Sequence, residues 1–404
     1  MKRKLYRKCP ICEFEEGEIL HNQKFLLPDQ HPLRNGYEVV LCDRCNFLFA
    51  DSAVTQSDYD IYYSDFSKYE DNHTSTGGGE AGFDSKRLEN VAQEIASIVE
   101  DKSLRVLDVG CANGGILKRL KQLGHTNIVG VDPSRVCVEY VKRELQLEAY
   151  EASLFNMPDS IGKFDLIILS HVLEHILNLN ECLEVITKFL NNEGRVYIEV
   201  PDAMRYVSFI TSPFQDFNTE HINHFTKTSL DNLFTNRSFV KLKGGAKTIE
   251  SAANMPYPAI YAFYRSSSIS NKETYQPDSE IKACIMDYII SSQKIIDRID
   301  AHLKAELSRG ENILVWGTGQ LTMKLLAIST LGDLPIINFV DSNPILRGKK
   351  LMNKLILHPS QLSGVSRETK VLITSTIHED EIKKDMIELY KLSNPIISLR
   401  NCLN

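Results

Sequence analysis

The sequence predicts an α/β protein of three parts: a small cysteine-rich module, a doubly wound sheet, and a second, smaller α/β unit. Two closely spaced cysteine pairs stand within the first fifty residues. Short apolar runs, glycine turns and amphipathic segments then alternate from residue 104, and the same pattern begins again at residue 312. That alternation is typical of parallel sheets covered by helices. A chain of 404 residues can hold two or three cores, and we place the parts at 1–70, 71–280 and 281–404.

Composition excludes several classes of partner. The chain is 43% hydrophobic and 25% charged, as in ordinary globular proteins, and its net charge is −7. An acidic chain without a dense basic run is a poor ligand for nucleic acid. No apolar run reaches the ~18–20 residues of a membrane helix, and the basic start has no apolar segment behind it. We expect a cytoplasmic protein, monomeric or weakly dimeric, without a nucleic-acid or membrane partner.

The cysteine pairs predict a structural zinc site. Cys9 and Cys12 stand in "CPIC", Cys42 and Cys45 stand in "CDRC", and residues 13–41 separate the pairs. Two such pairs can surround one tetrahedral ion with four thiolates and leave no open position, so a catalytic metal is not expected. The ion would fold a region with little core of its own. Reduced thiols without a metal are the alternative.

The stretch "SLRVLDVGCANGGILKRLKQLG" predicts the ligand-binding turn of the central sheet. The run 104–109 is a buried strand, the glycines follow, and an amphipathic helix begins at Ile116. Such a turn lets backbone approach a ligand at the carboxyl edge of a parallel sheet. Asp108 at the strand end would repel a diphosphate and suits a cationic amino acid with a sulfonium group. The predicted contacts in this turn are Asp108, Gly110, Cys111, Asn113 and Gly114.

Three further strand ends complete the predicted binding edge. "NIVGVDPS" ends a second strand at Asp132, beside Pro133, where the carboxylate can accept both ribose hydroxyls. "EASLFNMP" brings its middle residues alongside an adenine, and "KFDLIILSHVLEHI" ends a fourth strand. The side chains placed there are Ser153, Leu154, Phe155, Ser170 and His171. Glu174 and His175 are expected to begin the packing of the next helix.

These segments resemble the class I S-adenosylmethionine-dependent methyltransferases. The resemblance implies a doubly wound sheet, S-adenosylmethionine as cofactor, a fifth strand at 195–200 and a closing antiparallel hairpin from "SFVKLKG" and "YPAIYAFYR". Another nucleotide-binding α/β domain is the alternative. The N/D-P-P-Y segment of base N-methylases does not follow the fourth strand, and no Pro-Cys dipeptide of C5 methylases occurs. A nucleic-acid substrate is therefore disfavoured.

The last third reads as a polar linker, 266–280, a long helix, 281–309, and a second Rossmann-like unit. "NILVWGTGQ" gives a strand and a Gly317-x-Gly319 turn, and "LPIINFVDSNP" gives a second strand ending at Asp341. The third glycine of a dinucleotide fingerprint is absent. A substrate-docking or structural domain is therefore favoured over a bound dinucleotide.

The order of the three parts resembles the sugar C-methyltransferases, which act on nucleotide-linked 4-keto deoxysugars. The motifs that carry it are "CPIC…CDRC", "LDVGCANGG", "VDPS", "FNTEHINHFTKTSL" and "VWGTGQ…VDSNP". The resemblance implies that His221 is the base, that Glu220 is its partner and that His171 lies near the substrate. Asn218 stands where the family tends to carry a tyrosine. Tyr63 and Tyr69 are candidates for the family's other active-site tyrosine.

The expected reaction is methylation of carbon beside a ketone. His221 would remove the α-proton, Glu220 would orient the imidazole, and His171 or a tyrosine would donate to the enolate oxygen. An O- or N-methyltransferase of a sugar or other small metabolite is the alternative. A zinc-dependent RNA methylase and a binding protein without activity are two further interpretations, and a polar loop that only caps helices is the simplest interpretation of "EHINH".

Overall fold

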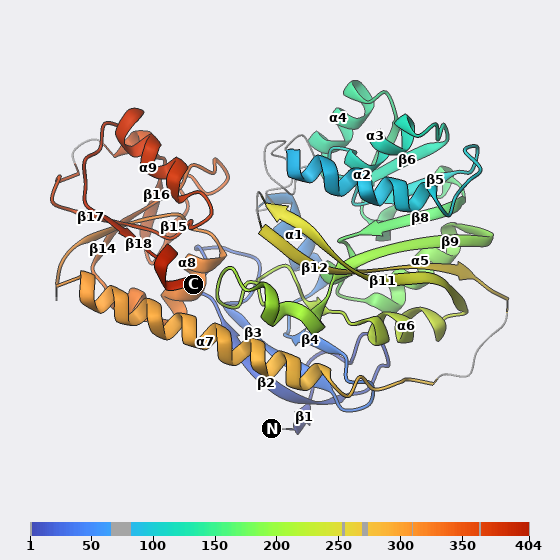
Figure 1. Ribbon diagram of the computed structural model, residues 1–404, viewed down its shortest axis with the longest axis horizontal. Coiled ribbons are helices and arrows are strands. Elements are labelled where there is room, and N and C mark those ends of the chain that lie inside the picture. The colour runs from blue at the N-terminus through green and yellow to red at the C-terminus, as the bar shows by residue number, and fades with distance from the viewer. Residues whose placement is uncertain are drawn as a thin grey trace.

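Three sheets build the protein in the computed structural model, which describes residues 2–65, 82–252, 255–268, 274–308, 310–362 and 365–403 (Figure 1). Tyr69 and the expected boundary at residues 70 and 71 lie outside these residues. In the described part of the chain, no helix is long and apolar enough to cross a bilayer.

The N-terminal sheet is antiparallel and takes its last strand from elsewhere in the chain. Its order is β1-β2-β3-β4-β10, and it is followed by helix α1. β10 comes from the central domain and pairs with β4 through Asn223–Phe49 and His224–Leu48. The N-terminal module is therefore joined to the central domain by main-chain pairing. Its elements are β1 (Lys2–Lys4), β2 (Glu16–Lys24), β3 (Gly36–Cys42), β4 (Leu48–Asp51), α1 (Gln56–Asp65) and β10 (Asn223–His224).

The central sheet has seven strands in the order β11-β12-β9-β8-β5-β6-β7. The strands from β7 to β9 are parallel, and the hairpin β11–β12 joins β9 antiparallel, as the resemblance to methyltransferases implied. The strands are β5 (Val106–Val109), β6 (Ile128–Asp132), β7 (Glu148–Glu151), β8 (Phe164–Ser170), β9 (Leu190–Pro201), β11 (Phe239–Ala252) and β12 (Met255–Ser266).

Helices cover both faces of this sheet, which explains why its middle strands are almost entirely apolar. Helices α2, α3 and α4 share one core with the strands, while α5, α6 and the N-terminal module share the other. In Figure 1 the first group lies above the sheet and the second below it. The helices are α2 (Gly82–Ala96), α3 (Gly115–Gln122), α4 (Arg135–Glu144), α5 (Leu179–Phe189) and α6 (Lys227–Thr235).

The C-terminal domain is a smaller parallel sheet in the order β15-β16-β14-β13-β17-β18, with only β15 antiparallel. Helix α7 (Ile281–Glu306) leads into it and ends close to the predicted residue 309. The remaining elements are β13 (Ile313–Trp316), α8 (Gln320–Ile328), β14 (Ile336–Val340), β15 (Lys350–Leu351), β16 (Lys354–Leu357), β17 (Lys370–Ile373), α9 (Glu379–Glu388), β18 (Ile396–Ser398) and α10 (Arg400–Leu403).

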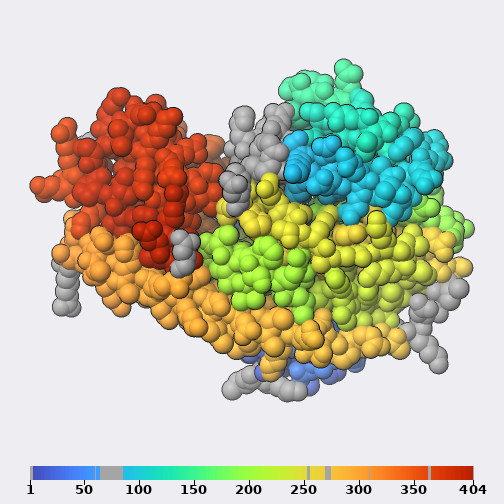
Figure 2. Space-filling view, viewed as in Figure 1, coloured from blue at the N-terminus to red at the C-terminus, as the bar shows by residue number. Residues whose placement is uncertain are grey.

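Helix α7 ties the three parts together. It runs along the base of the molecule from the central domain to the C-terminal domain (Figure 1). Its buried side chains share one apolar cluster with Val39 of the N-terminal module, Phe214 of the central domain and Val315 of the C-terminal sheet. In the space-filling view the central and C-terminal domains stand as two lobes on this common base (Figure 2). Because one core spans all three parts, we expect them to move as a unit.

Gly114 at the start of α3 provides a test of the predicted binding turn. Its φ is +74°, and a Cβ there would lie 2.7 Å from Leu145 Cδ1 and 2.9 Å from Val141 Cγ2. We expect Gly114→Ala to destabilise the protein by about 1–3 kcal/mol, through left-handed strain and overpacking. Gly124 also has a positive φ but meets nothing within 4 Å. Denaturant unfolding should therefore give a smaller loss for Gly124→Ala, and equal losses would contradict the packing explanation.

Candidate functional site

The connection between β9 and α6, residues 202–226, lies beyond the carboxyl ends of β8 and β9. It has little regular structure, and its backbone is held from several directions. Ala50 of the N-terminal module donates to Ile222 O at 2.9 Å, and Ile222 N donates to Glu174 O at 2.9 Å. Gln320 of the C-terminal domain donates to Thr219 Oγ1 at 2.6 Å. All three parts therefore position this connection.

A buried lysine of the C-terminal domain holds the middle of this connection, at Phe214. Lys324 on α8 is 1% exposed, and its ammonium donates to the carbonyl oxygen of Phe214. From helix α7, Ser292 Oγ accepts the Phe214 N–H at 3.1 Å and Tyr288 accepts the Asp216 N–H at 2.9 Å. Burial lowers the pKa of Lys324 to about 7, and the charge of Asp216 opposes this shift.

Asn218, where a tyrosine was expected, shapes the turn that presents Glu220 and His221. Its Oδ1 accepts the main-chain N–H groups of both residues at 2.8 Å. Its amide donates to Gln215 O at 3.1 Å, and its carbonyl accepts the Tyr37 hydroxyl at 2.9 Å. A short side chain that accepts from the following backbone is typical of an Asx turn. Asn218 therefore has a backbone role that tyrosine cannot fill.

Glu220 lies beside an aromatic side chain of α1, and His221 lies beside His175. Tyr62 donates its hydroxyl to Glu220 Oε1 at 2.5 Å. Tyr63, the predicted active-site tyrosine, packs against Tyr62 and lies edge-on to His175 with ring centroids 6.2 Å apart. No sequence pattern indicated the role of Tyr62, because 158 positions separate it from Glu220.

His221 is a mostly buried, neutral imidazole. Its ring lies 5.0 Å from that of His175, and its Nδ1 makes no hydrogen bond to any described residue. Burial lowers the pKa of His221 well below its ordinary value, and nearby His175 and His224 act in the same direction. The imidazole is therefore unprotonated and available as a proton acceptor at neutral pH. His224, by contrast, is completely buried beside Tyr206 and Phe217.

His171 is held between two carboxylates. Its Nδ1 lies 3.1 Å from Glu174 Oε1, and its Nε2 lies 3.2 Å from Glu199 Oε1. Burial opposes protonation, but the hydrogen bonds to the two carboxylates outweigh it and raise the pKa of His171 to about 9. Glu199 is in turn bound by Lys247 and by Tyr197, whose hydroxyl donates at 2.7 Å. Both ring nitrogens of His171 are thus engaged within the protein.

Glu174 and His175 belong to this cluster, so their expected role as packing residues of the next helix is wrong. They lie in a 3-10 turn, Leu173–His175, that ends before α5 begins. Glu174 is 1% exposed and contacts His171, while His175 donates from Nδ1 to Glu220 O at 3.1 Å. Three titratable residues within "SHVLEHI", just past a strand end, are the sequence signal that would have found them.

The predicted cofactor edge forms at the ends of β5 and β6. Asp108 is 2% exposed, and burial with the charge of Asp132 raises the pKa of Asp108 to about 8. Asp132 accepts from Ala112 N and Ser134 N, both at 2.8 Å. Gly110 has φ +70°, and a Cβ there would lie 3.1 Å from Val172. A cationic ligand beside Asp108 fits this edge, because it would favour the ionised carboxylate.

The other predicted cofactor residues divide into two groups. Cys111 and Leu154 are buried in apolar clusters, so only their backbone can face a ligand. Ser153 caps the 3-10 turn Leu154–Asn156, and Phe155 packs at the edge of the core. Asn113 is 5% exposed, and Ser170 Oγ at the end of β8 makes no hydrogen bond to a described residue. Pro133 and Gly114 complete the set, with Pro133 exposed.

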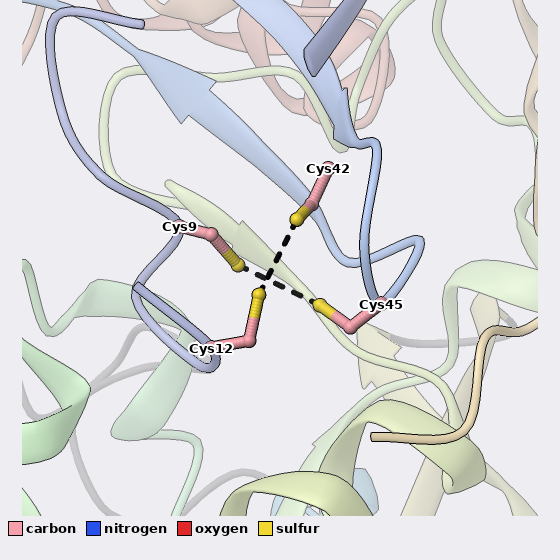
Figure 3. Close-up of side chains that lie close together, drawn as sticks. All are labelled: Cys9, Cys12, Cys42 and Cys45. Carbon is pink, nitrogen blue, oxygen red and sulfur yellow. Dashed lines mark hydrogen bonds between the residues drawn. The ribbon is translucent and has the colours of Figure 1, made fainter. Parts of the chain in front are cut away.

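The four N-terminal cysteines surround one point (Figure 3). Cys9 and Cys45 bring their sulfurs to 3.6 Å, and Cys12 and Cys42 to 3.4 Å, with all four side chains buried. Tetrahedral zinc with Zn–S bonds of about 2.3 Å requires sulfurs about 3.8 Å apart, so these donors fit the ion closely. Four thiolates would leave no ligand position for a substrate.

The glycine turn of the C-terminal domain is closed by its own residues. Thr318 donates its N–H and its hydroxyl to Asp341 Oδ2, at 2.8 and 2.7 Å. Gly317 has φ +102°, and a Cβ there would lie 2.9 Å from Thr374 Oγ1. Close packing of this turn against Thr374, which follows β17, therefore explains why position 317 is a glycine, and no bound dinucleotide is needed to explain it.

Comparison with known proteins identifies the central part. Residues 83–243 match the family described as methyltransferase domain, and residues 309–397 match the family described as C2185-like, N-terminal. Together with the seven-stranded order of the sheet, the first match makes this part a class I, S-adenosylmethionine-dependent methyltransferase domain.

Known methyltransferases are similar to parts of the chain. A ubiquinone biosynthesis O-methyltransferase of Bartonella quintana is 26% identical over 111 residues, which cover 26% of this chain and 44% of that protein. A ribosomal protein L11 methyltransferase of Thermosipho africanus is 33% identical over 98 residues, which cover 23% of this chain and 36% of that protein. The chain thus spans less than half the length of these two relatives. A magnesium protoporphyrin IX methyltransferase structure from Synechocystis PCC 6803 is 14% identical, with TM-score 0.42, over 53% of this chain and 100% of that one.

Loss of one thiolate tests the metal site. We expect the four cysteines to hold one zinc ion, and Cys9→Ser to lose that ion and to melt at a lower temperature, because the ion contributes folding free energy. Metal analysis and thermal unfolding measure both effects. Cys284→Ser, at a half-buried cysteine outside the cluster, should change neither. A zinc content and a zinc affinity of Cys9→Ser equal to those of the parent would contradict the assignment.

Buried neutral histidines should make the fold acid-labile. Burial lowers the pKa of His21 to about 4 and that of His224 to about 3. Between about pH 6.5 and pH 4 the unfolded chain binds more protons, so stability should fall with pH by up to about 1.4 kcal/mol per unit for each histidine. The raised pKa of His171 acts oppositely, because its contribution is complete below pH 6.5 and is lost as pH rises through about 9.

His21→Phe isolates one of these titrations. The imidazole of His21 stacks on Phe214 with centroids 4.5 Å apart and planes 14° apart, and phenylalanine can keep this stacking. Denaturant unfolding from pH 7 to pH 4 should therefore give a shallower loss of stability in the variant. An unchanged slope would show that His21 is not the titrating group.

Proposed function

We propose that the protein transfers a methyl group from S-adenosylmethionine to the carbon beside a ketone in a nucleotide-linked keto sugar. The observation that carries this proposal is the neutral imidazole of His221. It lies past the carboxyl edge of a methyltransferase sheet, with Nδ1 free of any hydrogen bond to the described residues. The choice of a nucleotide-linked sugar rests on the resemblance to sugar C-methyltransferases.

The cofactor would lie along the carboxyl edge of β5, β6 and β8. Asp108 would face its cationic end, Asp132 would accept from the ribose, and the turn from Gly110 to Gly114 would allow close backbone approach. Ser153, Phe155 and Ser170 would line the remainder. When bound, S-adenosylmethionine supplies an electrophilic methyl group on a sulfonium.

His221 would remove the α-proton from the substrate. The proton would pass to the imidazole, and the electron pair of the C–H bond would become the enolate. The hydroxyl of Tyr62 holds Glu220, and Nδ1 of His221 makes no hydrogen bond to a described residue, so Glu220 would act beside the base through its negative charge. A positioned base contributes about 10²–10⁴-fold to the rate. Holding the reacting groups in line can contribute on the order of 7–11 kcal/mol more.

The enolate oxygen needs a hydrogen-bond donor. Because both nitrogens of His171 contact carboxylates, we assign His171 to positioning Glu174 and Glu199 and not to the substrate. Tyr63, edge-on to His175, is our candidate donor. Zinc on the four cysteines would have a structural role only. It would fix the start of β4, the strand that pairs with β10.

Methylation of oxygen is a second candidate. The curated relatives include enzymes named as ubiquinone biosynthesis O-methyltransferases. In that reaction His221 would take the proton of a hydroxyl and the methyl group would go to oxygen. The same base serves both reactions, so the position of the lost proton distinguishes them.

Isotope exchange and one variant test the proposal. With a nucleotide-linked keto sugar and S-adenosylhomocysteine in heavy water, we expect deuterium next to the ketone, measured by mass spectrometry. His221→Ala should abolish exchange and lower turnover by at least about 10²-fold, since it removes the base. Binding of S-adenosylhomocysteine, measured by calorimetry, should survive, because His221 is outside the cofactor edge.

Two results would contradict the proposal in different ways. Turnover of His221→Ala within a few-fold of the parent would remove His221 as the base. Methyl transfer without deuterium exchange in the parent would favour the hydroxyl as the acceptor.

A further inference from the structure

Glu174, His175 and His221 place three metal-ligating groups together. One ligand atom from each lies within 4.8 Å of the other two, which among the described residues is true elsewhere only of the four cysteines. Glu174 and His175 come from the turn after β8, and His221 comes from the connection after β9. The cluster is thus built by two elements that meet at the carboxyl edge of the central sheet.

Two buried polar atoms of this cluster make no hydrogen bond to a described residue, although buried polar atoms usually have a partner. Glu174 is 1% exposed, and its Oε2 makes no hydrogen bond to any described residue. Nδ1 of His221 is also buried without such a bond. A buried carboxylate oxygen and an imidazole nitrogen without partners are costly. Both are electron-pair donors, so a single cation between them would satisfy both.

A hydrogen bond from the ring of His175 leaves its other ring nitrogen available as the third metal ligand. His175 Nδ1 lies 3.1 Å from the carbonyl oxygen of Glu220. A carbonyl only accepts, so Nδ1 carries the hydrogen and Nε2 presents its lone pair. That Nε2 lies 3.9 Å from Glu174 Oε1, which itself accepts from His171 Nδ1 at 3.1 Å. Metal-binding histidines and carboxylates are commonly oriented by such outer hydrogen bonds.

We propose that Glu174, His175 and His221 bind a divalent transition-metal ion, separately from the four-cysteine site. Two imidazoles and one carboxylate suit Zn²⁺, Co²⁺ or Ni²⁺ better than Mg²⁺ or Ca²⁺, which favour all-oxygen sites. Bonds of about 2.0–2.2 Å require the ligand atoms to close toward the ion by about 1 Å. Three protein ligands leave a position open for water or a substrate oxygen.

Metal binding has a consequence for catalysis that rests on the proposed function. An imidazole bound to the ion is a poor proton acceptor, so the ion should compete with the role of His221 as base. We therefore expect methyl transfer to fall as this second site fills. The binding site itself does not depend on that role.

Cobalt titration of the 404-residue protein, loaded beforehand with one equivalent of zinc on the four cysteines, tests the site. We expect one further equivalent of Co²⁺, with the visible spectrum of nitrogen and oxygen ligands and no thiolate-to-cobalt band. Glu174→Gln and His175→Ala should each weaken this equivalent by at least about 10-fold, as loss of an outer-sphere partner already costs 10–100-fold. Circular dichroism and the retained zinc verify that each variant is folded.

A surface pair provides the matched control. His378 is the N-cap residue of α9, its Nδ1 lies 3.4 Å from Oε2 of Glu381, and both side chains are exposed. His378→Ala should leave the second equivalent unchanged, and its loss there would assign the ion to the surface and overturn the proposal. Cobalt binding that is absent, or unchanged in both Glu174→Gln and His175→Ala, would overturn it as well. Cobalt that binds at the cluster while methyl transfer is undiminished would keep the site and remove His221 as the base.

Discussion

The pairing of β10 with β4 is the interaction on which the candidate site depends. The connection from β9 to α6 is too irregular to satisfy its own backbone, and buried N–H and C=O groups must find partners. The N-terminal module supplies them through Asn223–Phe49 and His224–Leu48. Two residue pairs thus fix the strand immediately after Glu220 and His221. Cys9 and Cys12 lie between β1 and β2, and Cys42 and Cys45 lie at the turn from β3 to β4, so their effect on the site is exerted through main-chain geometry.

Opposite protonation states of neighbouring histidines follow from their partners. His171 and His221 are both largely withdrawn from solvent, and burial alone lowers the pKa of an imidazole. His171 faces the carboxylates of Glu174 and Glu199, which reverse the effect of burial. His221 instead faces His175, and its Nδ1 makes no hydrogen bond to any residue that the structure describes. The site therefore holds a charged imidazole and a neutral one at the same sheet edge.

Local sequence patterns were enough to predict the strands of the central sheet. They could not predict contacts between segments that lie far apart in the sequence. The apolar runs predicted β5, β6, β8 and β9 because a strand covered on both faces needs continuous hydrophobicity. Glu174 and His175 were misjudged because the chain makes one 3-10 turn after β8 before α5 begins. Tyr62 reaches Glu220 across 158 positions, and no periodicity records such a contact. The four cysteines were the easiest residues to place together, because two closely spaced pairs suffice to form one cluster, and the zinc ion itself stays a prediction.

Lys324 and Gln320 give the C-terminal domain a direct hold on the same connection, at Phe214 and Thr219. The loop that bears Glu220 and His221 is therefore positioned by contacts from all three parts of the protein. An exchange of either neighbour for an unrelated domain would therefore remove contacts that hold this loop in place.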